Sequence, residues 1–304
     1  MAHLPLNSPV LRYAAFTRHG EGGNPAGVVL DARGLDSDEC LAIASTVNYS
    51  ETAFIEHATD EVSDGSVATS PREFNVRYFS PLAQVAFCGH ATIASAVALA
   101  DRDGVGSLLF HTLAGAISVE TTIGRDGISA TLMSPPTSTF DADPEDVAAT
   151  MQALGWCERD LDPRYPPHVS YAGNHHLILA ATTRGRLADL DYDYHTLEQL
   201  MNERRWTTVH LVYAESSDLF HARDPFPPGG VVEDPATGAA AAAFGGYLRA
   251  LNLVKVPGTV TIIQGEDMGR PCELKVHLSI EGNRVAVTGF ASRILDTSPY
   301  RNSR

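Results

Sequence analysis

Residues 231–248 read VVEDPATGAAAAAFGGYL and give the strongest indication of the fold. Two valines, an acidic pair and an Asp-Pro turn lead into a run of alanines, with no charge before Arg249. The pattern predicts a strand, a tight turn and a helix without a polar face, and a helix that is apolar all round must be buried. Because nearly all its residues are Ala or Gly, the backbone of other segments can approach the helix closely on every side. A curved sheet wrapped around the helix would bury it on all sides.

Asp234 and Thr237 are the polar residues of the turn before this helix. They would lie at its buried N-terminus, where backbone N–H groups without helical partners and the helix dipole attract a carboxylate or a phosphate. We therefore expect a binding site at this turn.

A second copy of the same pattern occurs earlier in the chain. Phe79-Ser80-Pro81 and Phe87-Cys88-Gly89-His90-Ala91-Thr92 lead into residues 93–100, which are again small and uncharged until Asp101. The matching glycines of the two copies, Gly89 and Gly238, are 149 residues apart. A second pair of matching positions has nearly the same separation: Gly23 and Gly173, each followed by Asn and an apolar strand, are 150 residues apart. Two copies of an unusual element indicate an internal duplication.

Length and patterning favour two similar domains. With 304 residues, 44% of them hydrophobic, the chain can bury a sizeable core. The usual size of protein domains favours two domains of about 150 residues each. Both halves show strands, an outer helix, more strands, a central helix and closing strands, which favours two α+β barrels over a doubly wound sheet. We assign residues 1–135 to an N-terminal barrel domain and residues 136–304 to a C-terminal one. The last strand, near 284–295, is a candidate to return to the first domain.

The local signals for the outer elements are specific. Amphipathic helices are predicted from Ser37 to before Asn48 and over Tyr194–Arg204, and a third over Pro144–Leu154 with Asp143 as its cap. Residues 58–73 are polar, acidic and without periodicity, and are predicted to form an exposed loop.

Charge and hydropathy exclude several classes of partner. The chain has 22 Lys plus Arg against 37 Asp plus Glu, a net charge of −15, so it would repel a nucleic-acid backbone over most of its surface. The N-terminal residues lack a basic region followed by an apolar one, and no apolar run approaches about 18 residues. We expect a soluble, cytoplasmic protein with no membrane partner.

The cysteines and histidines give no motif for a metal or a disulfide framework. The four cysteines are scattered, and no C-x-x-C pair is present. His175 and His176 are adjacent on a predicted strand and would point to opposite faces. Most of the cysteines are therefore interpreted as ordinary buried thiols.

Three features have both a functional and a structural interpretation. Glu51, at the start of a predicted strand, fits a solvated carboxylate at a strand edge as well as a catalytic group. His90 fits a packing residue at the start of a helix. The glycine-rich loop Arg18–Pro25 fits a simple hairpin connection and lacks the phosphate-loop pattern.

Five blocks, in order along nearly the whole chain, decide between these interpretations. They are Gly23-Asn24-Pro25-Ala26, Asn48-x-Ser50-Glu51-Thr52-Ala53-Phe54, Phe79-Ser80-Pro81 with Cys88-Gly89-His90-Ala91-Thr92, Glu233-Asp234-Pro235-Ala236-Thr237-Gly238, and Gln264-Gly265-x-x-Met268-Gly269-Arg270-Pro271. They resemble the signature blocks of the PhzF family of phenazine biosynthesis-like isomerases. The resemblance implies the diaminopimelate-epimerase-like fold, with two pseudo-symmetric barrels, an active site in the cleft between them, and a homodimer.

The same resemblance implies a chemistry. In the phenazine enzyme a glutamate that matches Glu51 moves a proton between two carbons of trans-2,3-dihydro-3-hydroxyanthranilate, without metal or organic cofactor. A single carboxyl group can take an acidic C–H proton and return it to another carbon on the same face, and burial should raise its pKa towards working pH. The resemblance assigns binding of the small carboxylate substrate to Gly89, His90, Asp234, Thr237, Gly238 and Ala239.

Two positions depart from the family pattern and bear on the substrate. Ala239 stands where the phenazine enzyme has a serine, so a hydroxyl that could bind substrate is lost. Gln84 stands where many relatives carry an acidic residue. The glutamate of the proton shuttle matches the family pattern. The two departures leave the substrate undecided, and an isomerase of another secondary-metabolite pathway is an alternative.

Two rival classes remain. An amino-acid racemase or epimerase of the same fold uses one cysteine from each half, and Cys88 is near the first expected position. The second motif offers Asp234-Pro235 and no cysteine, and a thiol on one side cannot serve both faces of a stereocentre. A binding protein without catalysis is the other rival, and the intact Glu51 argues against it.

Overall fold

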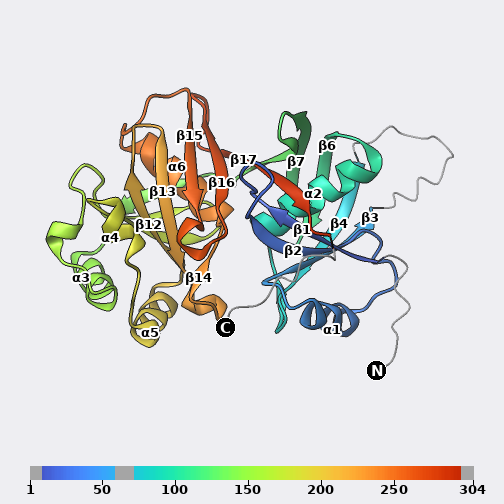
Figure 1. The fold of residues 1–304 in the computed structure, drawn as a ribbon, viewed down its shortest axis with the longest axis horizontal. Helices are drawn as coiled ribbons and strands as arrows, with labels where there is room; N and C mark the ends of the chain where they lie inside the picture. Colours follow the sequence, from blue (N-terminus) through green and yellow to red (C-terminus); the bar gives the residue numbers. More distant parts are fainter. Residues whose placement is uncertain (1–8, 59–71, 296–304) are drawn as a thin grey trace. The chain divides into compact units, whose positions relative to one another are not determined.

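The structure, a computed structural model, describes residues 9–58 and 72–295. The chain divides into two compact units, the first made of Met1–Leu132 with Gly289–Arg304 and the second of Met133–Thr288. Figure 1 shows the strands and helices of each. The exposed loop predicted at residues 58–73 lies almost entirely outside the described residues.

The first unit is a closed barrel of eight strands. Each strand pairs with its neighbour in the order β1-β2-β3-β4-β6-β7-β8-β17, and β17 pairs back onto β1. The short β5 (Gln84–Val85) pairs with β4 beside the barrel. The barrel strands are β1 (Val10–Ala15), β2 (Asn24–Val29), β3 (Thr52–His57), β4 (Arg72–Phe79), β6 (Gly106–Thr112), β7 (Gly115–Gly124), β8 (Gly127–Met133) and β17 (Ala286–Arg293).

The second unit repeats this arrangement. Its strands pair in the order β9-β10-β11-β12-β13-β15-β16-β17, with the short β14 (Glu233–Asp234) beside β13. Backbone hydrogen bonds from Ser134 and Thr137 to Val285 and Asn283 bring the two ends of the sheet together. The further strands are β9 (Ser138–Asp141), β10 (His168–Tyr171), β11 (His175–Ala180), β12 (Trp206–Ala214), β13 (Leu219–Pro225), β15 (Gly258–Gln264) and β16 (Cys272–Leu278).

The strand directions establish the duplication. In the first unit, β1 and β2 are antiparallel, β2 and β3 parallel, β3 and β4 antiparallel, and β4 and β6 parallel. The second unit has the same sequence of directions from β10 through β11, β12 and β13 to β15. The predicted fold class, an α+β fold of two pseudo-symmetric barrels, is therefore confirmed.

Each barrel surrounds one apolar helix, as predicted. These are α2 (Gly89–Asp103) and α6 (Gly238–Ala250), and each begins at the glycine of its motif. The small residues permit close packing of α6: a Cβ on Gly245 would lie 2.5 Å from Val276 Cγ1, and one on Gly246 would lie 2.5 Å from Thr137 Oγ1. The phenol of Tyr13 on β1 donates to Asp101 near the end of α2, with an O···O distance of 2.7 Å.

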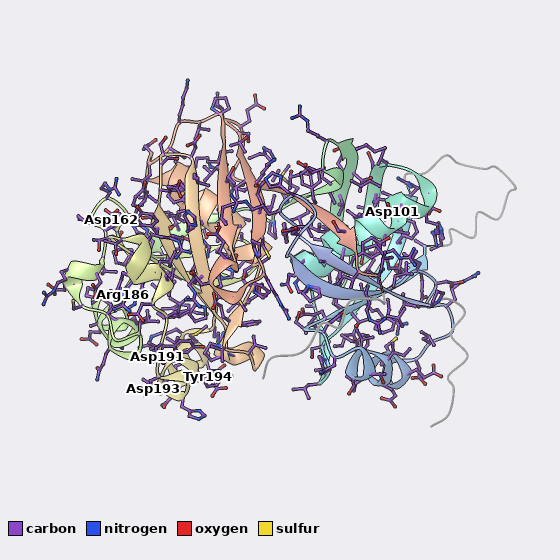
Figure 2. All side chains as sticks on the ribbon, in the orientation of Figure 1. Asp101, Asp162, Arg186, Asp191, Asp193 and Tyr194 are labelled. Carbon is purple, nitrogen blue, oxygen red and sulfur yellow. The ribbon has the colours of Figure 1, made fainter. Side chains whose placement is uncertain are left out.

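Outer helices cover the barrels. In the first unit α1 (Ser37–Val47) packs on β3 and β4. In the second unit α3 (Pro144–Ala153), α4 (Arg184–Ala188) and α5 (Tyr194–Arg204) form an outer layer. Residues of α3 and α5 share a buried apolar cluster with β11 and β12. Asp193, labelled in Figure 2, caps α5 by accepting a hydrogen bond from Thr196 N at 3.0 Å. None of the helices among the described residues is long and apolar enough to cross a membrane.

Candidate active site

Glu51 lies where the chain leaves α1 and enters β3. Asn48 ends α1 in the left-handed conformation, with φ of 56°, and three residues later the chain reaches Glu51. The Glu51 carbonyl accepts a hydrogen bond from Gly27 N at 3.2 Å, which fixes the backbone against β2. Its side chain is only 16% exposed, so Glu51 is not the solvated carboxylate that a strand edge alone would suggest.

The start of α2 provides the neighbours of Glu51. Cys88 is the N-cap residue, Gly89 the first helical residue and His90 the second. The Cys88 carbonyl accepts a hydrogen bond from Thr92 Oγ1 at 2.7 Å, and Thr92 Oγ1 is itself 2.7 Å from the phenol oxygen of buried Tyr78. These bonds hold the first turn of α2 against β4, and therefore hold Cys88 and His90 in place.

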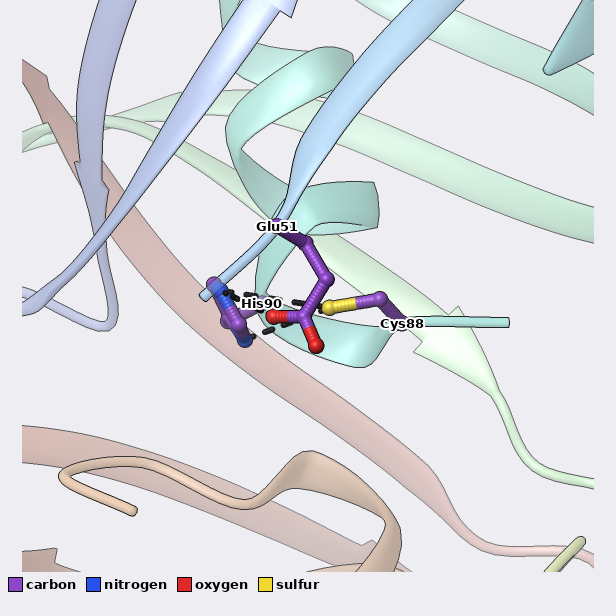
Figure 3. Close-up of side chains that lie close together, drawn as sticks. All are labelled: Glu51, Cys88 and His90. Atoms are coloured by element: carbon purple, nitrogen blue, oxygen red, sulfur yellow. Dashed lines mark hydrogen bonds and ion pairs between the residues drawn. The ribbon is translucent and has the colours of Figure 1, made fainter. Parts of the chain in front are cut away.

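Glu51, Cys88 and His90 form a compact cluster (Figure 3). Nε2 of His90 lies 3.3 Å from Glu51 Oε2 and 3.3 Å from the hydroxyl of Ser50. Nδ1 of the same ring lies 3.3 Å from Cys88 Sγ. Glu51 Oε2 is buried, and within the described part of the chain no donor is aligned for a hydrogen bond to it.

Burial raises the pKa of the Glu51 carboxyl above its usual value. Hydrogen bonds from the side chains of Ser50 and Cys88 oppose this effect, but the loss of solvation is the larger influence. Burial therefore makes the neutral form of Glu51 more favourable than it would be at the surface. A carboxyl group in this state can both accept and return a proton.

A second cluster forms at the start of α6, in the other unit. Thr237 is the N-cap residue, and its hydroxyl donates to Asp234 Oδ2 at 2.6 Å. Gln264 holds the turn from the other side: its Oε1 accepts from Thr237 N at 3.1 Å, and its Nε2 donates to the Asp234 carbonyl at 2.7 Å. The role of Gln264 was not predicted, although it begins one of the five sequence blocks.

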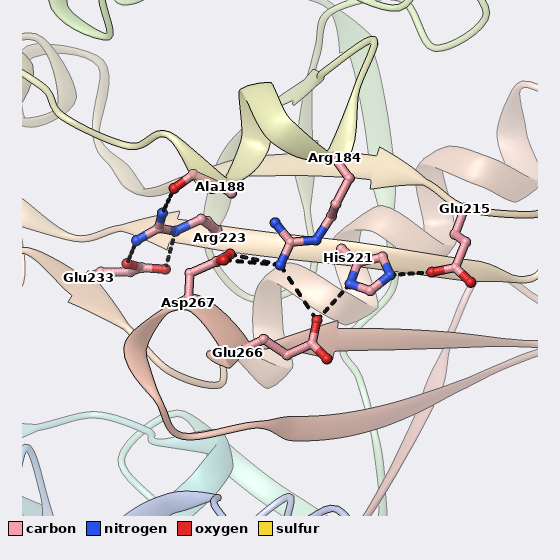
Figure 4. Close-up of polar contacts among 8 residues, drawn as sticks. All are labelled: Arg184, Ala188, Glu215, His221, Arg223, Glu233, Glu266 and Asp267. Carbon is pink, nitrogen blue, oxygen red and sulfur yellow. Dashed lines mark hydrogen bonds and ion pairs between the residues drawn. The ribbon is translucent and has the colours of Figure 1, made fainter.

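Ion pairs hold the segments around this turn, as Figure 4 shows. Arg223 on β13 donates two hydrogen bonds: from Nε to Glu233 Oε1 at 2.9 Å, and from Nη1 to the Ala188 carbonyl at 2.6 Å. Both side chains of the Arg223–Glu233 pair are nearly buried, at 11% and 4% exposed. Glu233 is thus a structural residue that anchors β14.

The loop that follows Gln264 is held in a similar way. His221 on β13 lies between two carboxylates, with Nδ1 2.9 Å from Glu266 and Nε2 2.6 Å from Glu215. Arg184 on α4 donates to Asp267 at 2.9 Å. The short 3₁₀ turn Glu266–Met268 is therefore fixed to the sheet and to an outer helix.

The structure places the predicted site residues in two groups. Glu51, Gly89 and His90 lie together in the first unit, and Asp234, Thr237, Gly238 and Ala239 lie together in the second. Gln84 is exposed on β5. Cys88 belongs to the first group and was not predicted as a site residue for a proton shuttle, although its position two residues before His90 was a signal.

Comparison with known proteins assigns the chain to a family. A family model described as PhzC-PhzF, phenazine biosynthesis-like protein, matches residues 13–296. An uncharacterized isomerase from Deinococcus radiodurans is 30% identical over 288 residues, which cover 91% of this chain and 90% of that protein. The trans-2,3-dihydro-3-hydroxyanthranilate isomerase of Pseudomonas chlororaphis is 27% identical over 260 residues, covering 84% of this chain and 85% of the relative.

A solved structure has the same fold. The Bacillus anthracis phenazine biosynthesis protein of the PhzF family superposes with a TM-score of 0.80 at 24% identity, over 94% of this chain and 96% of that chain.

Proposed function

Because the chain belongs to the PhzC-PhzF family of phenazine biosynthesis-like proteins, we propose that it moves a proton between two carbons of a small cyclic amino or hydroxy acid. The protein is an isomerase of this family. The Pseudomonas chlororaphis relative, named for its action on trans-2,3-dihydro-3-hydroxyanthranilate, supports a ring carboxylate of that kind as the substrate. Neither a metal nor an organic cofactor is part of the proposed reaction.

The observation that carries this proposal is the buried carboxyl of Glu51. Its raised pKa, caused mainly by burial, allows it to act as base and then as acid in one turnover. His90 Nε2, 3.3 Å away, can stabilise the carboxylate or bind a polar group of the substrate. In the proposed cycle Glu51 takes the proton from one carbon as a carboxylate, and as a carboxylic acid it gives the proton to another carbon on the same face.

We assign substrate binding to the starts of the two central helices. Gly89 and Gly238 are the first residues of α2 and α6, where backbone N–H groups lack helical partners and favour a negatively charged group. Asp234 can accept hydrogen bonds from an amino or hydroxyl group of the substrate. Ala239, which offers no hydroxyl, is where a difference in substrate from the phenazine enzyme would arise.

Turnover in deuterium oxide tests the reaction class and the substrate together. Purified protein treated with a chelator would be incubated with trans-2,3-dihydro-3-hydroxyanthranilate, and the ring protons followed by NMR. Isomerisation with deuterium at the new carbon position, and some retained proton if Glu51 exchanges slowly with solvent, is the expected result. Deuterium exchange into another cyclic amino or hydroxy acid would support the proton transfer by Glu51 and assign the enzyme to a different pathway. Failure to exchange any such compound would contradict the proposal.

One observation favours a second candidate, an amino-acid racemase or epimerase. Cys88 Sγ lies 3.3 Å from His90 Nδ1, and histidine is a common partner of reactive thiols. Inactivation by alkylation of Cys88, prevented by ligand and accompanied by epimerisation at a stereocentre, would replace the Glu51 mechanism with this one. A Cys88→Ser variant that keeps isomerase activity would dismiss it.

A further inference from the structure

We propose that Glu51, Cys88 and His90 also form a binding site for a thiophilic divalent cation such as Zn²⁺ or Co²⁺. No sequence motif marks this site, because the three residues are not arranged in a local pattern like C-x-x-C. In the part of the chain that the structure describes, each of the three offers one ligand atom, and these atoms lie within 4.8 Å of one another. Two of them are held at the first turn of α2, and the third lies immediately before β3.

The distances suit a tetrahedral ion. With metal–ligand bonds of about 2.0–2.3 Å and tetrahedral angles, neighbouring ligand atoms lie roughly 3.3–3.6 Å apart. His90 Nε2 is 3.3 Å from Glu51 Oε2 and 3.9 Å from Cys88 Sγ. These two distances are within a few tenths of an ångström of the tetrahedral values, and the third, between Glu51 and Cys88, is at most 4.8 Å. The fourth position would be left to water or another small ligand.

The charges also match. Glu51 Oε2 is buried and has no aligned hydrogen-bond donor among the described residues, so a bound cation would supply an interaction that this oxygen lacks. On binding, the Cys88 thiol would release its proton to solvent and its sulphur would bond to the metal, with no change of oxidation state. One carboxylate, one thiolate and one divalent cation form a neutral group, which a buried position tolerates better than a lone carboxylate.

The ligand types select the metal. A set of one thiolate, one imidazole and one carboxylate favours Zn²⁺ and Co²⁺ over the hard cations Mg²⁺ and Ca²⁺, which prefer oxygen ligands throughout. Calcium and magnesium should therefore fail to compete at similar concentrations.

Metal binding would have a functional consequence, and this part of the inference rests on the function proposed above. An ion bonded to Glu51 would occupy the lone pair that accepts the substrate proton. Zn²⁺ should thus act as a reversible inhibitor and not as a cofactor, and removal of the metal should restore turnover.

Cobalt spectroscopy tests the site without any need for activity. Full-length protein treated with a chelator would be titrated with Co²⁺. The expected result is one equivalent bound, with a thiolate-to-cobalt charge-transfer band and the visible bands of a tetrahedral ion, both lost when Zn²⁺ is added. Cys88→Ser should remove the charge-transfer band and weaken cobalt binding by at least about a hundredfold.

The chain offers a matched control at Cys157. Its Sγ also donates to a carboxylate, that of Asp160 at 3.1 Å, but this pair is exposed and is not part of the three-ligand group. Cys157→Ser should leave the cobalt spectrum unchanged. A charge-transfer band that survives Cys88→Ser, or that disappears in Cys157→Ser, would overturn the proposed site, as would the absence of any band at saturating cobalt.

A second variant keeps the test decisive if Cys88→Ser does not fold. Glu51→Gln retains the thiol and the imidazole but replaces the charged ligand with a neutral amide, so cobalt affinity should fall at least about tenfold while the charge-transfer band remains. Unchanged affinity would refute a three-ligand site.

The metal site and the proton shuttle can fail independently. A band that depends on Cys88, in a protein that still isomerises its substrate after Glu51→Gln, would preserve the metal site and reject the proposed function. Turnover that depends on Glu51, in a protein whose cobalt spectrum lacks a thiolate band, would do the reverse. If both hold, one equivalent of Zn²⁺ should lower turnover at least about tenfold, and a chelator should restore it.

Discussion

At the scale of single residues, Glu51 is the group on which the chemistry depends. Glu51→Gln preserves the size and much of the hydrogen bonding of the side chain but removes its titrating proton. We expect turnover to fall by at least about a hundredfold, measured by the NMR assay with the responsive substrate. Because kcat/KM requires the ionised base in the free enzyme, its acidic limb in the wild type should lie above pH 4.5, the usual carboxyl pKa. A variant that keeps most of its activity would remove Glu51 from the mechanism.

The same substitution has an effect on stability whose sign follows from the pKa shift. Burial raises the pKa of Glu51 in the folded state, so the folded protein binds this proton more tightly than the unfolded chain does. The contribution of Glu51 to stability is therefore full below the unfolded pKa of 4.5, and it is lost as pH rises through the folded pKa. Thermal unfolding of Glu51→Gln at pH 8 should give a Tm no lower than that of the wild type.

The advantage of the variant should shrink as the pH is lowered, and it should vanish below about pH 4.5. A wild type that is the more stable of the two at pH 8 would show that the buried carboxylate is better compensated than its surroundings suggest.

Asp234 and His90 should act in binding more than in proton transfer. Asp234→Asn removes a charge that can accept hydrogen bonds from the substrate, and His90→Ala removes a polar group beside Glu51. Each change should weaken binding of a substrate analogue, measured by calorimetry, by about 1 to 3 kcal/mol. Unchanged affinity in both variants would mean that neither residue contacts the ligand.

At the scale of elements, the close packing of α6 makes a specific prediction. Gly246→Ala would place a methyl group 2.5 Å from Thr137 Oγ1. That oxygen cannot move freely, because it donates to the Asn283 carbonyl at 2.7 Å and accepts from Arg249 at 3.0 Å. The clash should outweigh the helix propensity of alanine and reduce the free energy of unfolding by about 1 to 3 kcal/mol.

A matched control for this substitution lies on α4. Gly185 is an exposed helical residue, and a Cβ there would meet only Thr183 Oγ1, at 4.0 Å. Gly185→Ala should be neutral or stabilising by up to about 1 kcal/mol in the same denaturant experiment. If the two substitutions have equal effects, close packing is not what requires glycine in α6.

At the scale of the whole molecule, we propose a homodimer, the commonest assembly of soluble homo-oligomers and the one that the family resemblance implies. Light scattering coupled to size exclusion should give twice the chain mass of 32.6 kDa. A mass equal to one chain at every concentration tested would contradict the proposal.

The sequence by itself determined the central helices and the duplicated fold. A helix with no polar face is stable only when it is buried on all sides, so the alanine-rich run had to be the core of a barrel. The amphipathic pattern predicted a helix over Tyr194–Arg204, and α5 has these bounds. Such elements are encoded locally, by neighbours along the chain.

Other elements depended on partners that are distant in sequence. β14, of two residues, exists only because it pairs with β13, and β9, of four residues, pairs with β10. The strand predicted in residues 231–234 is only Glu233–Asp234 in the structure, and β9 is too short for its pattern to predict a strand. β17 ends where Tyr13 on β1 pairs with Arg293, so a partner distant in the sequence sets the end of this strand.

The active site, too, combines features that the sequence indicates with features that arise only from tertiary contacts. The sequence indicated Glu51, His90 and Asp234 as chemically capable residues, mainly through the family resemblance. Only the tertiary structure brings the carboxyl of Glu51 within 3.3 Å of His90 and leaves it 16% exposed. The raised pKa of Glu51 and the metal-ligating geometry with Cys88 arise from burial and from contacts between β3 and α2, two elements far apart in the chain. Solvation and through-space distance, which set both properties, are not encoded in a local pattern of residues.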